Sequence, residues 1–481
     1  MDIVFMSRTR FGILFIGLLI GAVSTQIANA QQKWSLQKCV EYAAANNLQI
    51  QQSKLTEQST KVTLLQNKLG LLPNLSAQGS QGYSFGRNIN PFTNTYVSQS
   101  IDYNNFSIST NWILFNGLRR ENEIKQSQLD LAANQKNTQQ MVNDISLNVA
   151  SAFLQVVLDK EQEKVAEDQV TLSKEEVDNT QKLVVGGSLA EGSLYDVQAQ
   201  LAKDQQSLVT AQNQLSLALL SLQQLLNLDK PVDTDVPSLE VNADMLTIAT
   251  DTGKLYASAL TTQPKIAAGQ FKVNSAAKAL SISRGSYYPT LSAFGSVSTN
   301  YSSIAQNVLI NNTGELVPIG IVENTSDIVD VYEPTYSYQN IPFGTQLNNN
   351  LGKVYGLQLS IPIFSNWQVR GDVQRSKISL QNEELNFAIT KQQLQKDVET
   401  AYTNAIGASK SYVAAMQSEE SLKKAFDYAT AKLNAGLITG TDYDTAKNNY
   451  ESAVSSLLQT KYQFIFDLKV LDFYQGKPLT L

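Results

Sequence analysis

The chain repeats one pattern of residues twice, and this duplication constrains its fold more than any other feature. The segment FNGLRRENEIKQSQLDL (115–131) aligns with FSNWQVRGDVQRSKISL (364–380), 249 residues later. The same spacing pairs Gly187 with Gly436 and superposes two heptad series, Leu201, Leu208, Leu215 and Leu222 on Tyr450, Leu457, Phe464 and Leu471. Such agreement at one spacing indicates a tandem duplication. Because LSAQGS (75–80) and LSAFGS (291–296) lie only 216 residues apart, the second copy carries an insertion.

Each copy is expected to form a helix, two strands, a long helix, a turn and a return helix. The first helices are expected at 35–69 and 253–283, and the return helices at 194–228 and 442–474. The long helices are expected at 119–185 and 368–434, where neither segment contains proline. A helix of this length would span roughly 100 Å. Apolar residues repeating every 3.5 positions along the return helices predict that these return helices supercoil against neighbours.

Four short segments have a different period. Apolar and polar residues alternate over 75–85, 106–114, 291–301 and 355–363. This alternation is typical of membrane β-barrel strands, and the half-buried strands of a soluble sandwich share it. Four strands cannot close a barrel, since known outer-membrane barrels begin at eight, so a barrel would be shared between two, three or four chains. The connections 86–101 and 302–352 are expected to be loops at its outer end.

The N-terminus has the features of an export signal. Arg8 and Arg10 precede an apolar run at 11–23, and Ala28-Asn29-Ala30 offers small residues for cleavage. This order predicts a signal peptide over 1–30, because a transmembrane anchor needs roughly 18 or more apolar residues. No later segment is expected to be a membrane helix, so a chain that enters a membrane would do so as a barrel.

The composition excludes several functional classes. The chain has no histidine and one cysteine, which removes histidine-based catalysis, histidine metal sites and thiolate zinc clusters. Its 37 basic and 43 acidic residues leave no positive excess for nucleic acid. Carboxylate pairs could serve a glycosidase, but no acidic pair lies at a strand end or in a cleft context. We therefore expect no enzyme activity, cofactor or metal.

Six motifs together resemble those of the TolC-like outer-membrane efflux protein family. They are WSLQKCVEYAAANNLQI (34–50), LGLLPNLSA (69–77), WILFNGLRR (112–120), GGSLAEGSLYDVQAQLA (186–202), LSIPIFSN (359–366) and AGLITGTDYDTA (435–446). The resemblance implies a mainly α fold with a small β part. Three chains would form a homotrimer with a long α-helical coiled-coil barrel and one transmembrane β-barrel, to which each chain contributes four strands.

The resemblance also implies a location, partners and a domain order. The protein would lie in outer-membrane lipid, extend into the periplasm, and pass cargo from an inner-membrane transporter through a periplasmic adaptor (membrane fusion) protein. The first efflux repeat would cover 31–230, a linker 231–252, and the second repeat 253–475, with a C-terminal tail at 476–481. The long loop 302–352 would then be extracellular. The alternative is a secreted periplasmic coiled-coil structural or adaptor protein.

Candidate site residues lie at the two helix–turn–helix tips, about 184–194 and 433–442. In the family, acidic residues at the start of the last helix surround the closed periplasmic entrance, and the matching positions here are Asp442, Asp444 and Thr445. The match of Asp444 is less clear, because the second carboxylate of the family aligns nearer to Thr445 than to Asp444. Three copies of Asp442 around an axis would attract cations and also repel one another.

Two further groups of residues complete the candidate site. Some family members latch the entrance with an arginine, but 433–445 contains no Lys or Arg. The latch would then involve Tyr195, Asp196 or Tyr443. Gly187, Gly192, Gly436 and Gly440 would form the turns against which an adaptor docks. An alternative reading is purely structural, because Thr441-x-x-Asp444 and Ser193-x-x-Asp196 both have the spacing of helix capping boxes.

Overall fold

A computed structural model describes residues 33–89, 94–230, 233–235, 241–246, 251–311 and 314–477. The long helices α3 (Arg119–Val185) and α8 (Gln368–Asn434) have 67 residues each and the predicted bounds. They return as α4 (Glu191–Leu226) and α9 (Gly440–Tyr474). α3 begins 249 residues before α8, and α4 begins 249 residues before α9, so the duplication is also structural. The expected signal peptide lies outside the described residues.

The first helix of each copy is divided in two, and the prediction of one continuous helix is wrong at these points. α1 (Leu36–Asn46) ends at Asn47, whose side chain accepts hydrogen bonds from the backbone of Gln49 and Ile50 and so caps α2 (Leu48–Leu69). In the second copy, α5 (Thr252–Thr262) and α6 (Pro264–Gly285) meet at Gln263. A proline disfavours helical backbone at the residue before it, and Gln263 precedes Pro264, which explains this second break.

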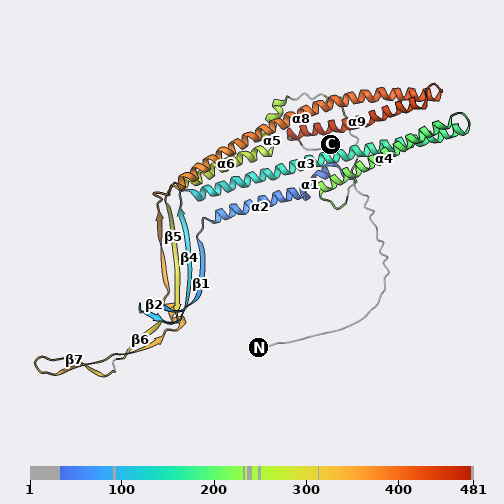
Figure 1. Cartoon of the computed structure of the whole chain (residues 1–481). Coiled ribbons are helices and arrows are strands. Elements are labelled where there is room, and N and C mark those ends of the chain that lie inside the picture. Colours follow the sequence, from blue (N-terminus) through green and yellow to red (C-terminus); the bar gives the residue numbers. More distant parts are fainter. Residues whose placement is uncertain are drawn as a thin grey trace, which may run out of the picture.

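One antiparallel sheet contains the four predicted strands in the order β1–β4–β5–β10. These strands are β1 (Asn74–Ser84), β4 (Ile101–Phe115), β5 (Thr290–Ser302) and β10 (Gly352–Ser360). The two copies meet where β4 pairs with β5, and the sheet lies at one end of the helices (Figure 1). Within the described residues, β1 and β10 have no strand on their outer edges.

Left-handed backbone joins the sheet to each long helix. Gly117 and Leu118 precede α3 with φ of 70° and 61°, and Asn366 and Trp367 precede α8 with φ of 47° and 66°. A Cβ at Gly117 would lie 2.3 Å from the carbonyl oxygen of Gly285. Glycine is therefore required at this junction for both conformation and space.

The outer connections contain regular structure, so the prediction of loops is wrong there. β2 (Arg87–Ile89) pairs with β3 (Tyr96–Ser98), β6 (Gln306–Asn311) with β9 (Thr335–Asn340), and β7 (Leu316–Ile321) with β8 (Ile328–Tyr332). A short helix, α7 (Phe343–Asn349), precedes β10. The β6–β9 ribbon extends beyond the end of the sheet that is far from the helices (Figure 1). Cross-strand pairs such as Val308 with Tyr338 stabilise it.

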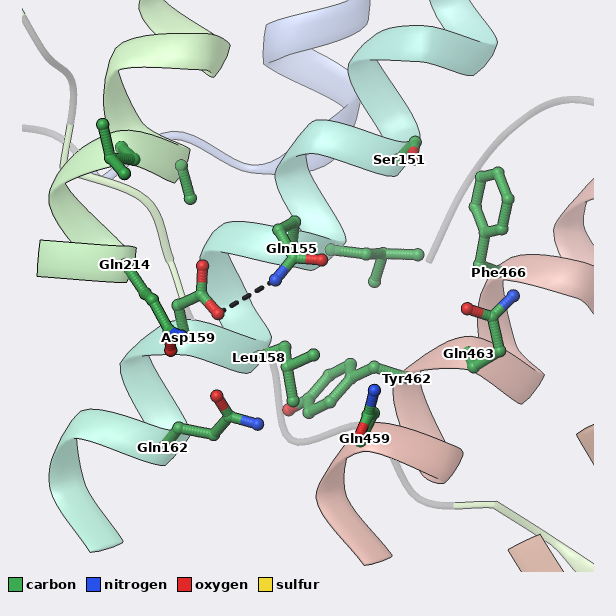
Figure 2. Close-up of a pocket in the computed structure, with 13 residues that line it drawn as sticks. Ser151, Gln155, Leu158, Asp159, Gln162, Gln214, Gln459, Tyr462, Gln463 and Phe466 are labelled. Carbon is green, nitrogen blue, oxygen red and sulfur yellow. Dashed lines mark hydrogen bonds between the residues drawn. The ribbon is translucent and has the colours of Figure 1, made fainter. Parts of the chain in front are cut away.

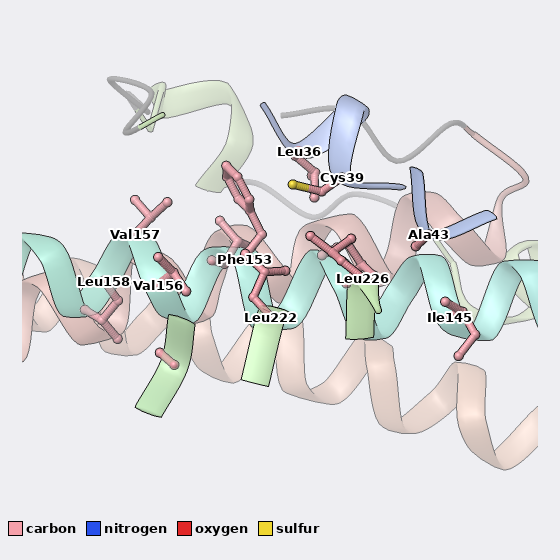
Figure 3. Close-up of a cluster of buried hydrophobic side chains, with 14 of the residues drawn as sticks. Leu36, Cys39, Ala43, Ile145, Phe153, Val156, Val157, Leu158, Leu222 and Leu226 are labelled. Carbon is pink, nitrogen blue, oxygen red and sulfur yellow. The ribbon is translucent and has the colours of Figure 1, made fainter. Parts of the chain in front are cut away.

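The main hydrophobic core lies where α1, α3 and α4 meet (Figure 3). Phe153 and Leu222 are fully buried there with Cys39, and burial raises the pKa of the Cys39 thiol to about 11. Part of α3 is long and apolar enough to cross a membrane, contrary to the expectation that no later segment would be. Half of that stretch is buried within this chain.

Candidate functional site

The two hairpin tips have the same backbone geometry. Each long helix ends in a glycine with left-handed backbone, Gly187 at φ 70° and Gly436 at φ 75°. The next amide reaches back five residues in each case, from Ser188 to the Leu183 carbonyl and from Leu437 to the Lys432 carbonyl, both at 2.9 Å. These bonds are the helix-ending pattern that a left-handed glycine permits. A Cβ at either glycine would meet no atom within 4 Å, so both tips are open.

The other two candidate turn glycines lie inside helices. Gly440 is the first residue of α9, and Gly192 is the second residue of α4. A Cβ at either position also meets no atom within 4 Å. All four glycines therefore lie at open tips, but only Gly187 and Gly436 form the turns themselves.

The second tip has a capping box that the first lacks. The Thr439 hydroxyl accepts from the Asp442 amide at 3.3 Å, and the Asp442 carboxylate accepts from the Thr439 amide at 3.2 Å. Hydrogen bonds from the Thr439 hydroxyl and backbone lower the pKa of Asp442. The capping boxes expected from Thr441 and Ser193 are wrong, because both residues lie within the first turn of their helices. The corresponding cap of α4 is Ala190, which has no side-chain hydrogen bond to offer.

The predicted gate residues face different surroundings. Asp442 and Thr445 are exposed, and the Thr445 hydroxyl donates to the Thr441 carbonyl at 2.8 Å. Asp444 points toward the chain interior, and its Oδ1 atom is buried without a hydrogen-bond partner. Burial raises the pKa of Asp444, and the nearby charges of Asp196 and Asp204 raise it further, against the opposing effect of Lys447.

The latch candidates are also separated. The Tyr195 hydroxyl is exposed and lies 3.4 Å from Glu191 on its own helix. Tyr443 instead packs on Phe426 of α8, with ring centroids 5.6 Å apart, and burial raises its pKa to about 12. The negative charge of Asp196 acts on Asp444 and raises the pKa of the Asp444 carboxyl. In the part of the chain that the structure describes, the hydroxyls of Tyr195 and Tyr443 share no hydrogen bond.

A buried polar cluster just above the tips was missing from the sequence predictions. We call it the Lys447 cluster, and its members are Ser173 and Glu176 of α3, Asp204 of α4, and Asp444, Lys447 and Glu451 of α9. The side chains of Lys447 and Asp204 are only 2% and 5% exposed. The spacing 444, 447 and 451 places three charged residues on one helix face, which is the signal that could have indicated it.

A polar groove runs from this cluster toward the main core, between α3, α4 and α9. Its larger cavity, about 710 Å³, is lined by five glutamines together with apolar side chains such as Leu154 and Phe466, and Gln155 donates to Asp159 at 2.9 Å (Figure 2). A second cavity of about 350 Å³ connects it to Glu451. Among the residues that the structure describes, no group of His, Cys, Asp or Glu side chains is arranged to hold a metal ion.

Solved structures with the same fold are outer-membrane channels. The chain superposes on CusC with a TM-score of 0.73 and 16% identity, covering 93% of each chain. For VceC from Vibrio cholerae the TM-score is 0.70 at 14% identity, covering 92% of this chain and 96% of the other. The open state of MtrE from Neisseria gonorrhoeae gives 0.70 at 15% identity, covering 92% and 89%. No curated protein sequence matches the chain significantly.

Two long helical hairpins joined to a four-stranded sheet with open edges define the architecture of an outer-membrane channel protein. The family model for outer membrane efflux proteins matches residues 39–228 and 255–476. The chain therefore belongs to the outer membrane efflux protein family, whose members are channels rather than enzymes.

Proposed function

We propose that three copies of this chain form the outer-membrane exit duct of a tripartite efflux or type I secretion system. The duct conducts substrates passively from an inner-membrane transporter and a periplasmic adaptor to the outside. Each chain supplies four strands to a twelve-stranded barrel and two helical hairpins to a periplasmic tunnel. The tips at Gly187 and Gly436 receive the adaptor, together with Gly192 and Gly440, and Asp442 lies at the entrance with Asp444 and Thr445.

The open four-stranded sheet is the observation that carries this proposal. One face of the sheet exposes large apolar side chains, and Leu75 (77% exposed) and Tyr355 (89% exposed) lie on that face in one cross-strand row. The outer edges of β1 and β10 leave backbone groups unpaired within the described residues. In lipid every such group must be paired, which a closed barrel made from several copies achieves. A periplasmic coiled-coil protein, the alternative, would have to cover this sheet by another route.

Membrane fractionation of the processed protein, detergent extraction and mass determination test the duct. We expect a heat-modifiable particle of about 150 kDa in the outer membrane, corresponding to three copies of a chain of 52.9 kDa before processing. A monomer or dimer in the soluble periplasmic fraction would exclude the duct and support the coiled-coil alternative.

Asp442→Ala tests the entrance in the purified trimer. We expect a weaker cation preference, because three converging negative charges would be lost. Glu420→Gln is the control, since Glu420 is exposed on α8 and paired with Lys424 at 2.8 Å. Equal changes in both variants would contradict a specific role for Asp442.

A further inference from the structure

Lys447 is the centre of a bonded cluster that joins three helices. Its ammonium group donates to the Ser173 hydroxyl at 2.6 Å and lies 3.6 Å from Asp204 Oδ2. The Ser173 hydroxyl in turn donates to Asp204, so α3, α4 and α9 are connected in one chain of polar contacts. Gln200 holds the other Asp204 oxygen at 2.8 Å. Removing one partner of such a buried pair leaves the other charge uncompensated.

The Lys447 cluster lies near the start of α9, and the apolar contacts of α9 with the main core lie near its end. Nearer the membrane end, Tyr462 and Ile465 of α9 enter the main hydrophobic core. The polar groove with its two cavities lies between that core and the Lys447 cluster. α9 is therefore held to α3 and α4 by an apolar contact at its far end and by a charged contact close to the tip.

The duplication does not produce this cluster. Counterparts 249 residues away carry none of its charges: they are Leu422 for Ser173, Ala425 for Glu176, Ala453 for Asp204, Tyr195 for Asp444, Gln198 for Lys447 and Ala202 for Glu451. The cluster is therefore particular to the contact of α9 with α3 and α4 and is not a feature that both hairpins share.

We propose that the Lys447 cluster is a proton-sensitive pin that holds the α9 end of the second hairpin against the first hairpin, just above the tips. Its effect on conductance rests on the proposed duct function, while the pin itself does not. Acid strengthens the pin, and alkali weakens it, because its carboxyls are buried beside only one buried cation.

Burial of Glu451 determines the direction of this response, and charges from three helices modify it. Its own helix presents Lys447 and Asp444, α4 presents Lys203 and Asp204, and α3 presents Glu176 to the same cluster. On the other side of α9, Glu419 and Asp427 of α8 face Tyr450. Asp196 of α4 adds its charge near Asp444. Carboxyl groups therefore approach Lys447 from both packed helices and from α9 itself.

Burial raises the pKa of Glu451 to about 7, and it raises the pKa of Glu176 and Asp444 as well. If α9 moves away, these groups return to solvent, where Glu451 titrates near 4.5. The pinned state therefore binds more protons than the released state between about pH 4.5 and 7. Raising the pH through this window shifts the equilibrium toward release.

Hydrogen–deuterium exchange of peptides covering 440–455, measured on the purified full-length protein in detergent, tests the pin. In Lys447→Met we expect exchange of this segment to accelerate by about tenfold or more, equivalent to the loss of 1.36 kcal/mol. Lys432→Met is the matched control, because Lys432 is an exposed lysine in the last turn of α8. Equal exchange in wild type and Lys447→Met would overturn the proposal.

Glu451→Gln provides a second variant that keeps Lys447 in place. After correction for intrinsic exchange rates, we expect wild-type exchange of 440–455 to rise between pH 5 and 8. The glutamine variant should show a weaker rise and slower exchange at pH 8, whereas Glu420→Gln should follow wild type. A Glu451→Gln profile identical to wild type would overturn the proton-sensitive part, even if Lys447→Met failed to fold.

Planar-bilayer conductance separates the pin from the proposed function. We expect Lys447→Met channels to conduct more than wild type, and Glu451→Gln channels to lose sensitivity to pH between 5 and 8. If the wild-type protein forms no pore, the duct function fails, and the exchange experiment still decides the pin. Unchanged conductance with faster exchange would overturn only the link between the pin and the entrance.

Discussion

The two long helices have equal length but very different surroundings. α3 has 17 buried residues, while α8 has six. α3 packs against α1, α2, α4, α6 and α9, whereas α8 borders α5, α6 and α9. The first hairpin is therefore anchored along most of its length within one chain. The second hairpin leaves apolar residues such as Leu385 and Tyr428 exposed, and in the proposed trimer a neighbouring copy would cover them.

This difference shows that duplication preserved the helices but not their roles. Val149 and its counterpart Val398 are both fully buried, so the middle of each long helix retains its core contact. Farther along, Phe153 is fully buried while its counterpart Tyr402 is half-buried. The first hairpin provides the fixed frame, and the second is attached to it through α6, the main core and the Lys447 cluster.

Truncation of the aromatic pair should give the largest difference between the hairpins. We expect Phe153→Ala to destabilise the folded protein by about 3–5 kcal/mol, because it leaves a cavity in the main core. Tyr402→Ala should cost clearly less, since that side chain is half-buried beside the smaller core cluster. Denaturant unfolding of the detergent-solubilised protein measures both. Equal losses would refute the unequal anchoring.

Loss of the Asp204 carboxylate should have the next largest effect. Asp204→Ala leaves Lys447 buried without its ion-pair partner and should cost about 3 kcal/mol. The double variant Asp204→Leu with Lys447→Met should recover most of this loss, because it removes both charges. Unfolding free energies of the single and double variants give the comparison. Additive losses would mean that the two residues do not act as a pair.

The turn glycines should respond equally, because their geometry is equal. Gly187→Ala and Gly436→Ala each place a side chain in left-handed backbone with no neighbouring atom within 4 Å. We expect each to cost about 1 kcal/mol from backbone strain alone. Thermal unfolding measures the two losses. A much larger effect at one tip would reveal a contact that the other tip lacks.

The helix caps should respond unequally. Thr439→Ala removes a capping box and should cost about 1 kcal/mol. The reverse change, Ala190→Thr, supplies a capping side chain to α4 and should stabilise the first tip by a smaller amount. Hydrogen exchange in the first turns of α4 and α9 measures the local effect. Faster exchange of α4 in Ala190→Thr would contradict this expectation.

Acid should have the smallest effect, through Asp442. Because hydrogen bonds from Thr439 lower the folded-state pKa of this carboxyl, its contribution to stability is present above the ordinary value of 3.8. It is lost as pH falls through the lowered folded-state pKa. Asp442→Asn should remove this acid-dependent part of helix stability, as measured by circular dichroism between pH 5 and 2. Asp442 is fully exposed, so the change should be slight.

Long periodic segments were predictable, and contacts between distant segments were not. The bounds of α3 and α8 follow from the repeat, the heptads and the absence of proline. The capping register did not, because Thr439-x-x-Asp442 and Thr441-x-x-Asp444 have the same spacing. The end of α8 at Asn434, followed by the turn through Gly436, decides between them. The break at Asn47 also requires the Asn47 side chain to meet the carbonyl of Leu225, 178 residues away.

The Lys447 cluster illustrates the same limit at the candidate site. Its charges come from three helices that are distant in sequence, and no local pattern indicates that Ser173 and Lys447 meet. The outer ribbon could be expected only as an insertion, because its strand pairs depend on cross-strand neighbours such as Ile310 and Tyr336. Sequence patterns therefore identified the helices and the four main strands, while packing determined the remaining contacts.

The open edges of β1 and β10 have a consequence for how the protein is made. A chain that folds this sheet alone exposes two edge strands with unsatisfied backbone groups and one face of apolar side chains. Such edges readily pair with any other extended chain and promote aggregation. For the proposed trimer, aggregation is therefore favoured in the interval between export and association with partner copies. Delayed folding of the strands, or binding of a chaperone to them, would prevent this aggregation.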